Sequence, residues 1–219
     1  MQDKYIKMLN SGDLYDPRVL GDEQISLRQK VNDYNNTIAE PSSIPLRKEM
    51  LRKRLKNAGK NIFIEPPFHS SWGGSHVSIG NDFYANFNLT LIDDAEIIIG
   101  NNVRCGPNVT IVTAAHPIHP KLRKNWIEYN KPVVIGDGVW IGACCTILPG
   151  VHIGNNSVIG AGSVVTKDIP DNVVAFGSPA KVYREITQED YEYYDHGKKI
   201  SQERIDKYGR AIARKGKCC

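Results

Sequence analysis

The stretch that decides the fold is residues 135–170, IGDGVWIGACCTILPGVHIGNNSVIGAGSVVTKDIP, which repeats itself every six residues. Aliphatic side chains occupy one column of the repeat: Ile135, Ile141, Ile147, Ile153, Ile159 and Val165. Small or apolar side chains occupy a second column: Val139, Cys145, Val151, Ser157, Ser163 and Ile169. A unit of six residues suits one short strand and a turn, so three units make a triangular coil of about 18 residues that stacks on the next. We therefore predict an all-β solenoid of parallel strands whose interior holds the aliphatic column.

A looser form of the same repeat precedes this stretch. Inward positions six apart are followed by a slip of two residues, after which the count resumes: Ile79, Ala85, Leu91 and Ile97, then Ile99, Cys105 and Ile111. The period is lost in the segment PIHPKLRKNWIEYN, residues 117–130, before it starts again. We predict a loop at 117–132. Because insertions in repeat proteins cluster on the binding face, we expect this loop to be functional, with a harmless insertion as the alternative.

The N-terminal residues 1–60 follow a helical pattern. One apolar stripe runs from Ile25 to Ile38 and a second from Leu46 to Leu55, with Gly59 as the expected helix stop. So few residues cannot hold a core alone, and we predict a small helical cap that packs on the first coils of the solenoid, residues 61–186.

The formal charge of +4 is concentrated in a basic C-terminal extension, residues 187–219. From Gly197 to the end there are eight Lys or Arg and two acids. Such a tail could contact nucleic acid or anionic lipid, but a solvated, weakly ordered tail is the preferred interpretation. The final Cys218-Cys219 pair resembles a prenylation doublet, which we set aside because nothing else in the chain resembles the proteins that carry one.

Composition excludes several classes of protein. No apolar run among the 219 residues approaches the roughly 20 that span a bilayer, and the first residues lack the apolar core of a signal peptide. The five cysteines do not resemble a disulfide framework. Neighbouring strand residues face opposite ways, so Cys145 is expected inside and Cys144 outside, with Cys105 at an inward position. Reduced cysteines used in this way indicate the cytoplasm.

Two polar residues lie where the repeat could carry chemistry. His116 sits where the repeat ends and the loop begins, and a neutral imidazole accepts a proton at physiological pH. Asn86 follows inward Ala85 and should face outward, where an amide can orient a hydroxyl or support an oxyanion. The alternatives are a plain surface histidine and a turn-stabilising asparagine. The two residues are 30 apart, about one and a half coils after the slip, so they are not expected to stack within one chain and could meet across a subunit contact.

Several motifs together point to one family. They are NDFYANFN (81–88), Thr113-x-x-His116-Pro117, VWIG (139–142), LPG (148–150), IGAGSVVTKDIP (159–170) and GSPA (177–180). As a set they resemble the maltose and galactoside O-acetyltransferases, which are hexapeptide-repeat acyltransferases. The resemblance covers about residues 3–186, cap included.

The resemblance implies a left-handed parallel β-helix, although parallel crossovers are otherwise almost always right-handed. It also implies a homotrimer with sites between neighbouring subunits, acetyl-CoA as donor, a sugar hydroxyl as acceptor, and no metal, nucleic acid or membrane partner. By matching position, His116 is the general base and Asn86 orients the acceptor and stabilises the transition state. Acceptor-binding positions match Asp16, Ser71, Asn86 and Asp94, the first with an alignment uncertain by a residue. Positions that line the CoA groove match Trp140, Ala143, Ala161, Thr166, Lys167, Lys181 and Arg184.

The chain departs from the family pattern in places. Position 143 is Ala where relatives often carry Ser, position 181 is Lys where Arg is common, and the tail after about Thr187 is additional. These departures leave the acceptor open. An O-acetyltransferase of xenobiotics such as antibiotics shares the repeats and the histidine. A zinc hydratase would need three converging histidines, of which His116 and His119 supply two. A purely structural solenoid is the last alternative.

Overall fold

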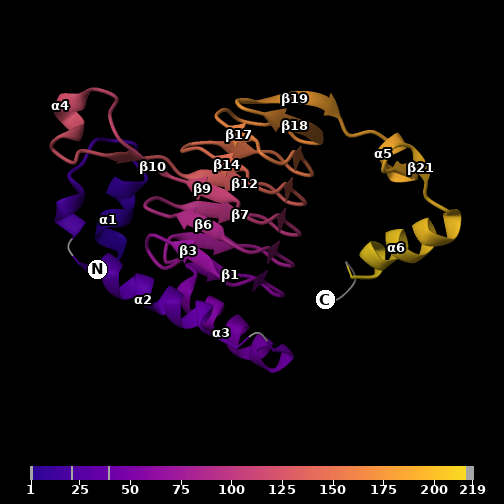
Figure 1. Cartoon of the computed structure of the whole chain (residues 1–219), viewed down its shortest axis with the longest axis horizontal. Helices are drawn as coiled ribbons and strands as arrows, with labels where there is room; N and C mark the ends of the chain where they lie inside the picture. The colour runs from indigo at the N-terminus through magenta and orange to yellow at the C-terminus, as the bar shows by residue number, and fades with distance from the viewer. Residues whose placement is uncertain (1, 21, 39, 216–219) are drawn as a thin grey trace. The chain divides into compact units, whose positions relative to one another are not determined.

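The structure is a computed structural model that describes residues 2–20, 22–38 and 40–215. The chain divides into two compact units, Met1–Arg184 and Glu185–Cys219. The first unit is a stack of triangular coils built from short parallel strands, each paired with the strands one coil before and one coil after it (Figure 1). This arrangement is the parallel solenoid that the six-residue repeat predicts.

Each coil passes through three sheets in turn, which we call the first, second and third face. The first face holds β1 (Asn57–Ala58), β4 (Val77–Ile79), β7 (Ile97–Ile99), β12 (Val133–Ile135) and β15 (His152–Ile153). The second face holds β2 (Phe63–Ile64), β5 (Tyr84–Ala85), β8 (Arg104–Cys105), β13 (Trp140–Ile141), β16 (Val158–Ile159), β18 (Val173–Gly177) and β19 (Ala180–Glu185). The third face holds β3 (Phe68–Ser70), β6 (Leu89–Ile92), β9 (Thr110–Val112), β14 (Thr146–Ile147) and β17 (Val164–Val165).

The interior of the coils is the predicted pair of columns. Every residue that we placed in the two columns between 135 and 170 is buried. The register puts Ile135 beside Ile153 and Ile147 beside Val165, so the regular coil is 18 residues long. Cys105 and Cys145 are buried free thiols and Cys144 is exposed, as predicted from the alternation of strand residues.

Three coils are longer, and the extra segments all leave at the corner between the third and first faces. Ser70 pairs with Leu91, a spacing of 21, because the turn after β3 is extended. Leu91 pairs with Ile111, a spacing of 20, because Asp93 and Asp94 lengthen the corner after β6. Ile111 pairs with Ile147, a spacing of 36, because the predicted loop follows β9. That loop begins and ends in an antiparallel pair, β10 (Ala114–Ala115) with β11 (Tyr129–Asn130), and contains α4 (Pro120–Arg123).

The N-terminal cap consists of α1 (Gln2–Leu9), η1 (Pro17–Leu20), α2 (Glu23–Asn35), η2 (Pro41–Ser43) and α3 (Ile44–Arg54). Buried Val31, Tyr34, Leu51 and Leu55 join the solenoid core, and the Tyr34 hydroxyl donates to the Ile64 carbonyl at 2.6 Å. The cap therefore closes the first coils, and β1 already pairs with β4 at residue 57.

Parts of the helical pattern were wrong. Ile25 and Ile38 are 66% and 70% exposed, because the buried face of α2 is carried by Val31 and Tyr34. Gly59 does not end a helix, since α3 already stops at Arg54. Gly59 instead lies in a solenoid corner, where a Cβ would come within 2.5 Å of the Gly80 backbone. Close stacking of corners, rather than helix capping, requires glycine there.

The second unit has secondary structure of its own, where we expected a weakly ordered tail. It contains α5 (Glu189–Glu192), an antiparallel pair of β20 (Tyr193–Tyr194) with β21 (Lys198–Lys199), and α6 (Gln202–Lys215). The Cys218-Cys219 pair lies outside the described residues. Within the part of the chain that is described, none of the helices combines the length and apolar character that crossing a bilayer requires.

Candidate active site

His116 is exposed and directly follows β10 at the base of the loop. Its Nδ1 lies 2.9 Å from the Ile127 carbonyl oxygen. A carbonyl only accepts, so Nδ1 carries the proton in this contact and Nε2 of the neutral ring is left to accept one. Beneath it, the Thr113 hydroxyl donates to the Ile92 carbonyl and accepts from the Ala95 amide, which fixes the loop base on the preceding corner. The histidine is therefore held in the tautomer that a general base needs.

A network that the sequence did not predict joins the loop to the cap beside His116. The backbones of Tyr15 and Glu128 exchange two hydrogen bonds of 2.9 and 3.1 Å. The Tyr15 hydroxyl donates to Glu128 Oε2 at 3.2 Å and accepts from Asn130 Nδ2 at 2.8 Å. The only hint in the sequence is the position of Glu128 and Asn130, immediately before the repeat resumes.

Electrostatics tie this network to Asp94. Burial raises the pKa of Glu128, and the negative charge of Asp94 raises it further. Burial also raises the pKa of the Tyr15 hydroxyl, with Glu128 and Asp94 adding to the effect against the Asn130 hydrogen bond. Tyr15 is therefore a hydroxyl donor, and two carboxyl groups share one partly desolvated region near the histidine.

The lengthened corner after β6 gives its two aspartates different surroundings. Asp93 is fully buried and accepts from the Ser70 hydroxyl at 2.6 Å and the Trp72 amide at 2.8 Å, so it holds the corner together. Asp94 is 9% exposed and accepts from Trp72 Nε1 at 3.0 Å. Asp94 is thus the aspartate on this corner whose charge reaches the network around Tyr15.

Ser71 lies on the same corner column, after β3. It is half-buried, and Arg28 Nε of the cap donates to its carbonyl at 3.2 Å. Ser71 also borders a cleft of about 310 Å³ between cap and solenoid, together with Arg28, Val31, Asn32, His69, Ser70 and Ile92.

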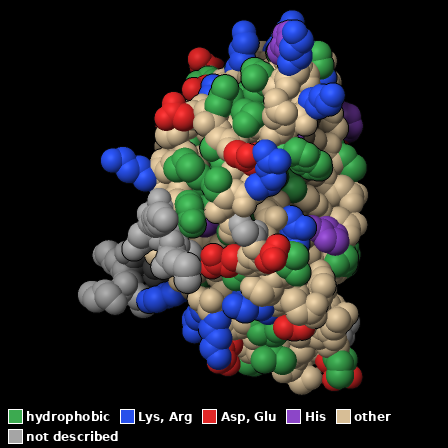
Figure 2. Space-filling view, turned by 90° about the vertical axis from the view of Figure 1, so that its left-hand side faces the viewer, with side chains coloured by type: hydrophobic (Ala, Val, Ile, Leu, Met, Phe, Trp, Pro, Cys, Tyr) green, Lys and Arg blue, Asp and Glu red, His purple; other side chains and the backbone are tan. Residues whose placement is uncertain are grey.

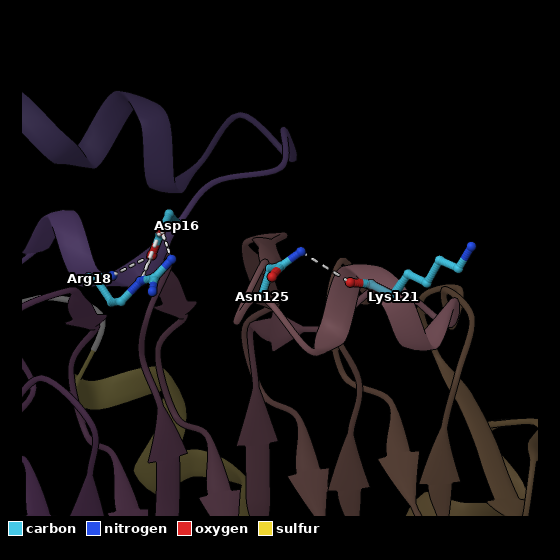
Figure 3. A network of polar contacts seen from close by, with 4 residues as sticks. All are labelled: Asp16, Arg18, Lys121 and Asn125. Carbon is cyan, nitrogen blue, oxygen red and sulfur yellow. Dashed lines mark hydrogen bonds and ion pairs between the residues drawn. The ribbon is translucent and has the colours of Figure 1, made fainter.

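Asp16 forms an ion pair within the cap. Its carboxylate forms an ion pair with Arg18, with Oδ2 2.5 Å from Nη2, and the hydrogen bonds from Arg18 lower the pKa of Asp16. Figure 3 shows this pair on the cap across from α4, where the Asn125 side chain donates to the Lys121 carbonyl at 3.3 Å. The sequence analysis did not identify Arg18 as the partner of Asp16.

Asn86 lies at a different corner, between the second and third faces. Its Oδ1 accepts from the Phe87 amide at 2.8 Å. The turn itself is stabilised by Asn88, which has a positive φ of 61° and donates to Asn108 Oδ1 at 3.0 Å. Among the contacts of the described residues, Asn86 Nδ2 has no protein acceptor, so it is available to a ligand.

The third face separates Asn86 from His116. About five extended residues cross that face, which corresponds to roughly 16 Å. The structure therefore brings His116, Ser71 and Asp94 to one edge of the face, and Asn86 to the other.

The residues matched to the CoA groove are distributed along the upper coils. Trp140 projects from β13 and is 56% exposed, and Lys181 and Arg184 are exposed on β19. Thr166 and Lys167 are exposed at the end of β17.

Ala143 and Ala161 stack at the same corner as Asn86. At the corner between the first and second faces, side chains close the ladder: Asn155 Oδ1 accepts from the Asp137 amide at 2.9 Å, for example. The methyl side chains of Ala143 and Ala161 cannot accept a hydrogen bond from the neighbouring coil in this way. A Cβ on Gly142 would lie 2.6 Å from the Ala161 nitrogen, so the coils stack closely here. This corner consequently offers backbone amides to a ligand that runs along it.

The face that carries the cap and the loop is a mosaic of hydrophobic, cationic and acidic side chains (Figure 2). Among the residues for which the structure gives side chains, no three His, Cys, Asp or Glu converge as a metal site. His119 has a structural role at the start of α4, where its Nδ1 accepts from the Lys121 amide at 3.3 Å.

Comparison with known proteins places this chain in a family. The family described as bacterial transferase hexapeptide (six repeats) matches residues 132–167. A galactoside O-acetyltransferase of Lactococcus lactis subsp. lactis (strain IL1403) is 51% identical over 197 residues, which cover 89% of this chain and 94% of that protein. This chain belongs to the maltose and galactoside O-acetyltransferase family.

Solved structures agree with that assignment. A galactoside acetyltransferase in complex with coenzyme A is 42% identical, with a TM-score of 0.84 over 92% of this chain and 99% of that one. A maltose O-acetyltransferase from Clostridium difficile 630 is 43% identical, with a TM-score of 0.78 over 83% and 96%. Hexapeptide repeats wind as a left-handed β-helix, so both the family and the fold class predicted from the sequence are confirmed.

The raised pKa of Glu128 predicts a pH-dependent stability. The contribution of Glu128 to the free energy of unfolding is full at pH values below its ordinary pKa of 4.5. That contribution is lost as the pH rises through the raised pKa of the folded state. Glu128→Gln removes this loss and keeps an acceptor for Tyr15. We expect the free energy of unfolding of the variant, relative to wild type, to rise from about pH 4 to about pH 8, measured by urea denaturation at each pH.

Glu49→Gln is the matched control, because the hydrogen bond from Lys53 lowers the pKa of Glu49. Its difference from wild type should change in the opposite direction or stay flat, since Glu49 is exposed. A Glu128→Gln curve parallel to wild type would show that this carboxyl titrates alike in the folded and unfolded states.

Proposed function

We propose that this protein transfers the acetyl group of acetyl-CoA to a hydroxyl of a sugar of galactoside or maltose type. The observation that carries the proposal is the geometry of His116, whose Nδ1–H is occupied by the Ile127 carbonyl and whose Nε2 has no partner among the described residues. The ring also interacts electrostatically with Glu128. The relatives named as galactoside and maltose O-acetyltransferases support the acceptor class.

In the proposed reaction, His116 Nε2 removes the proton of the acceptor hydroxyl as its oxygen attacks the thioester carbonyl. The carbonyl oxygen gains negative charge, which the free Nδ2 of Asn86 is suited to stabilise. When the carbon–sulfur bond breaks, His116 returns the proton to the departing sulfur. No step needs a metal, because the chain supplies both the base and the oxyanion donor.

The acceptor pocket is rich in groups that receive hydrogen bonds. Asp94 and Glu128 supply carboxyl oxygens that would accept from sugar hydroxyls. Ser71 borders the neighbouring cleft. Asp16 would contribute only if its pairing with Arg18 opened. A polyol satisfies such a pocket better than a largely apolar antibiotic, which favours the sugar over the xenobiotic acceptor.

Acetyl-CoA would lie along the corner with open amides at Ala143 and Ala161, beside Trp140. Thr166 and Lys167 follow β17 at the opposite edge of the third face, so in this arrangement they would reach the cofactor from the neighbouring subunit. Lys167, Lys181 and Arg184 supply positive charge for its phosphates. Lys181 binds a phosphate as a point charge, where arginine would offer a planar fork.

We further propose a cytoplasmic homotrimer whose partners are acetyl-CoA and a small sugar, with neither nucleic acid nor membrane. The buried free thiols of Cys105 and Cys145 support a reducing compartment. Asn86 and His116 lie on opposite edges of one face, which supports a site completed by the Asn86 edge of one subunit and the His116 edge of its neighbour.

His116→Ala tests the base. Turnover at saturating acceptor should fall by about 10²–10⁴-fold, while CoA affinity changes little. His119→Ala is the control on the same loop, and it should retain turnover because its ring caps α4. Near-wild-type turnover of His116→Ala would refute the assignment.

Mixed trimers test the shared site. His116→Ala and Asn86→Ala trimers should each be nearly inactive. After joint denaturation and refolding at equal ratio, about a quarter of the interfaces combine two intact edges, so about a quarter of wild-type activity should return. If the mixture stays as inactive as its parents while refolded wild type recovers, both residues serve one site within a chain.

Steady-state kinetics with CoA that lacks its 3′-phosphate test the role of the three cationic residues. Alanine at Lys167, Lys181 or Arg184 should raise the KM for acetyl-CoA more than it lowers kcat, because these contacts lie far from the reacting carbonyl. The variant that loses the 3′-phosphate contact should no longer distinguish intact from dephospho-CoA in steady-state kinetics. If wild type and all three variants distinguished intact CoA from dephospho-CoA equally well, none of these residues would contact the 3′-phosphate.

A further inference from the structure

A second polar cavity lies apart from the candidate active site, at the base of the cap. It has a volume of about 320 Å³ and forms where the end of α3 meets α1 and the corner between β3 and β4. Its polar lining comes from Lys53, Arg54, Lys56, Ser75 and His76, with Ile6 of α1 on the apolar side. None of these residues is used by the proposed acetyl transfer.

Three atoms of residues that line this cavity are buried without a hydrogen-bond partner. They are Nε and Nη1 of Arg54 and the hydroxyl oxygen of Ser75. Burial lowers the pKa of Arg54, against the opposing charge of Asp33. Buried donors without acceptors are rare in proteins because each forfeits its hydrogen bond to water. Arg54 and Ser75 therefore keep hydrogen-bonding capacity that no protein acceptor uses.

The charge of the lining is positive. Lys53 pairs with Glu49 at 2.6 Å and Lys56 pairs with Glu96, but neither acid borders the cavity. No salt bridge to Arg54 occurs among the residues that the structure describes. A helix C-terminus attracts cations, which accounts for Arg52, Lys53 and Arg54 in the last turn of α3 but not for the burial of the Arg54 donors.

The lining is also held in place. The Arg54 guanidinium lies 6.0 Å above the centre of the Tyr34 ring. His76 Nδ1 donates to the Asp93 carbonyl at 2.7 Å, and its ring lies 5.1 Å from that of Trp72. Fixed donors lose little entropy when a ligand binds.

We propose that this cavity binds a phosphate group, either free inorganic phosphate or the monoester of a small molecule. Guanidinium, ammonium and hydroxyl donors without a lining acid match an acceptor-only oxyanion. The volume is at the lower end of small-molecule pockets, so it admits a phosphate with a compact organic body.

Isothermal titration of the full chain saturated with CoA tests the proposal, since CoA occupies the cations of the proposed active site. The probes are inorganic phosphate, hexose 6-phosphate, the parent hexose and acetate, at constant ionic strength. We expect one saturable phosphate site per chain. Arg54→Met should weaken it by about tenfold or more, the usual scale for a charged hydrogen bond, and Ser75→Ala by a smaller factor.

Arg52→Met is the matched control, because Arg52 is exposed in the same helical turn and does not line the cavity. It should bind like wild type, with circular dichroism checking that each variant is folded. Should Arg54→Met misfold, Ser75→Ala alone decides, because it leaves the packing on Tyr34 intact. Tighter binding of hexose 6-phosphate than of phosphate identifies a monoester, and equal binding identifies the free anion. The proposal is overturned if neither phosphate binds saturably, if acetate binds as well, or if Arg52→Met loses as much affinity as Arg54→Met.

Discussion

The stacking of one aliphatic side chain on its equivalent in the next coil is the constraint on which the rest of the structure depends. Strands of two or three residues have too few hydrogen bonds to persist alone, so each relies on the coils above and below it. Burying an Ile side chain stabilises by about 1.5–3 kcal/mol, and every regular coil contributes several such residues to one continuous core. This demand fixes the inward positions and the 18-residue coil length, while it leaves the corners free to vary.

The three corners use that freedom in different ways. The corner between the first and second faces is closed by side-chain amides and carboxylates that accept from the coil next to them: Asn81, Asn101, Asp137, Asn155 and Asp171. In two of the upper coils, the corner between the second and third faces carries Ala143 and Ala161, whose side chains accept no hydrogen bond from the next coil. The corner between the third and first faces tolerates insertions, because residues added there leave the inward register of the strands unchanged. The extra residues of the three lengthened coils and His116 all lie at this last corner, so the scaffold confines its chemical variation to places where the core does not depend on it.

This division explains what the sequence could predict. The buried columns, the inward Cys145 and the outward Cys144 follow from a period of six, which is a local pattern. Tyr15 and Glu128 escaped prediction because they are 113 residues apart and meet only when the cap packs against the loop. The exposure of Ile25 and Ile38 could not be predicted for the same reason. The face of α2 that becomes buried depends on where the helix packs on the solenoid. Motif matching indicated His116 and Asn86 as candidate site residues but could not show that Arg18 pairs with the carboxylate of Asp16.

A solenoid face cannot fold over to bring its two edges together, because bending it would break the hydrogen bonds between coils. His116 and Asn86 stand on the two edges of the third face, so neither can reach the other through a change within the chain. In the proposed arrangement, the missing half of each site comes from a neighbouring copy. Reactivity would then depend on assembly while stability depends on the coil, so the loop and the cap could change the acceptor pocket around Glu128 and Asp94 without changing the core.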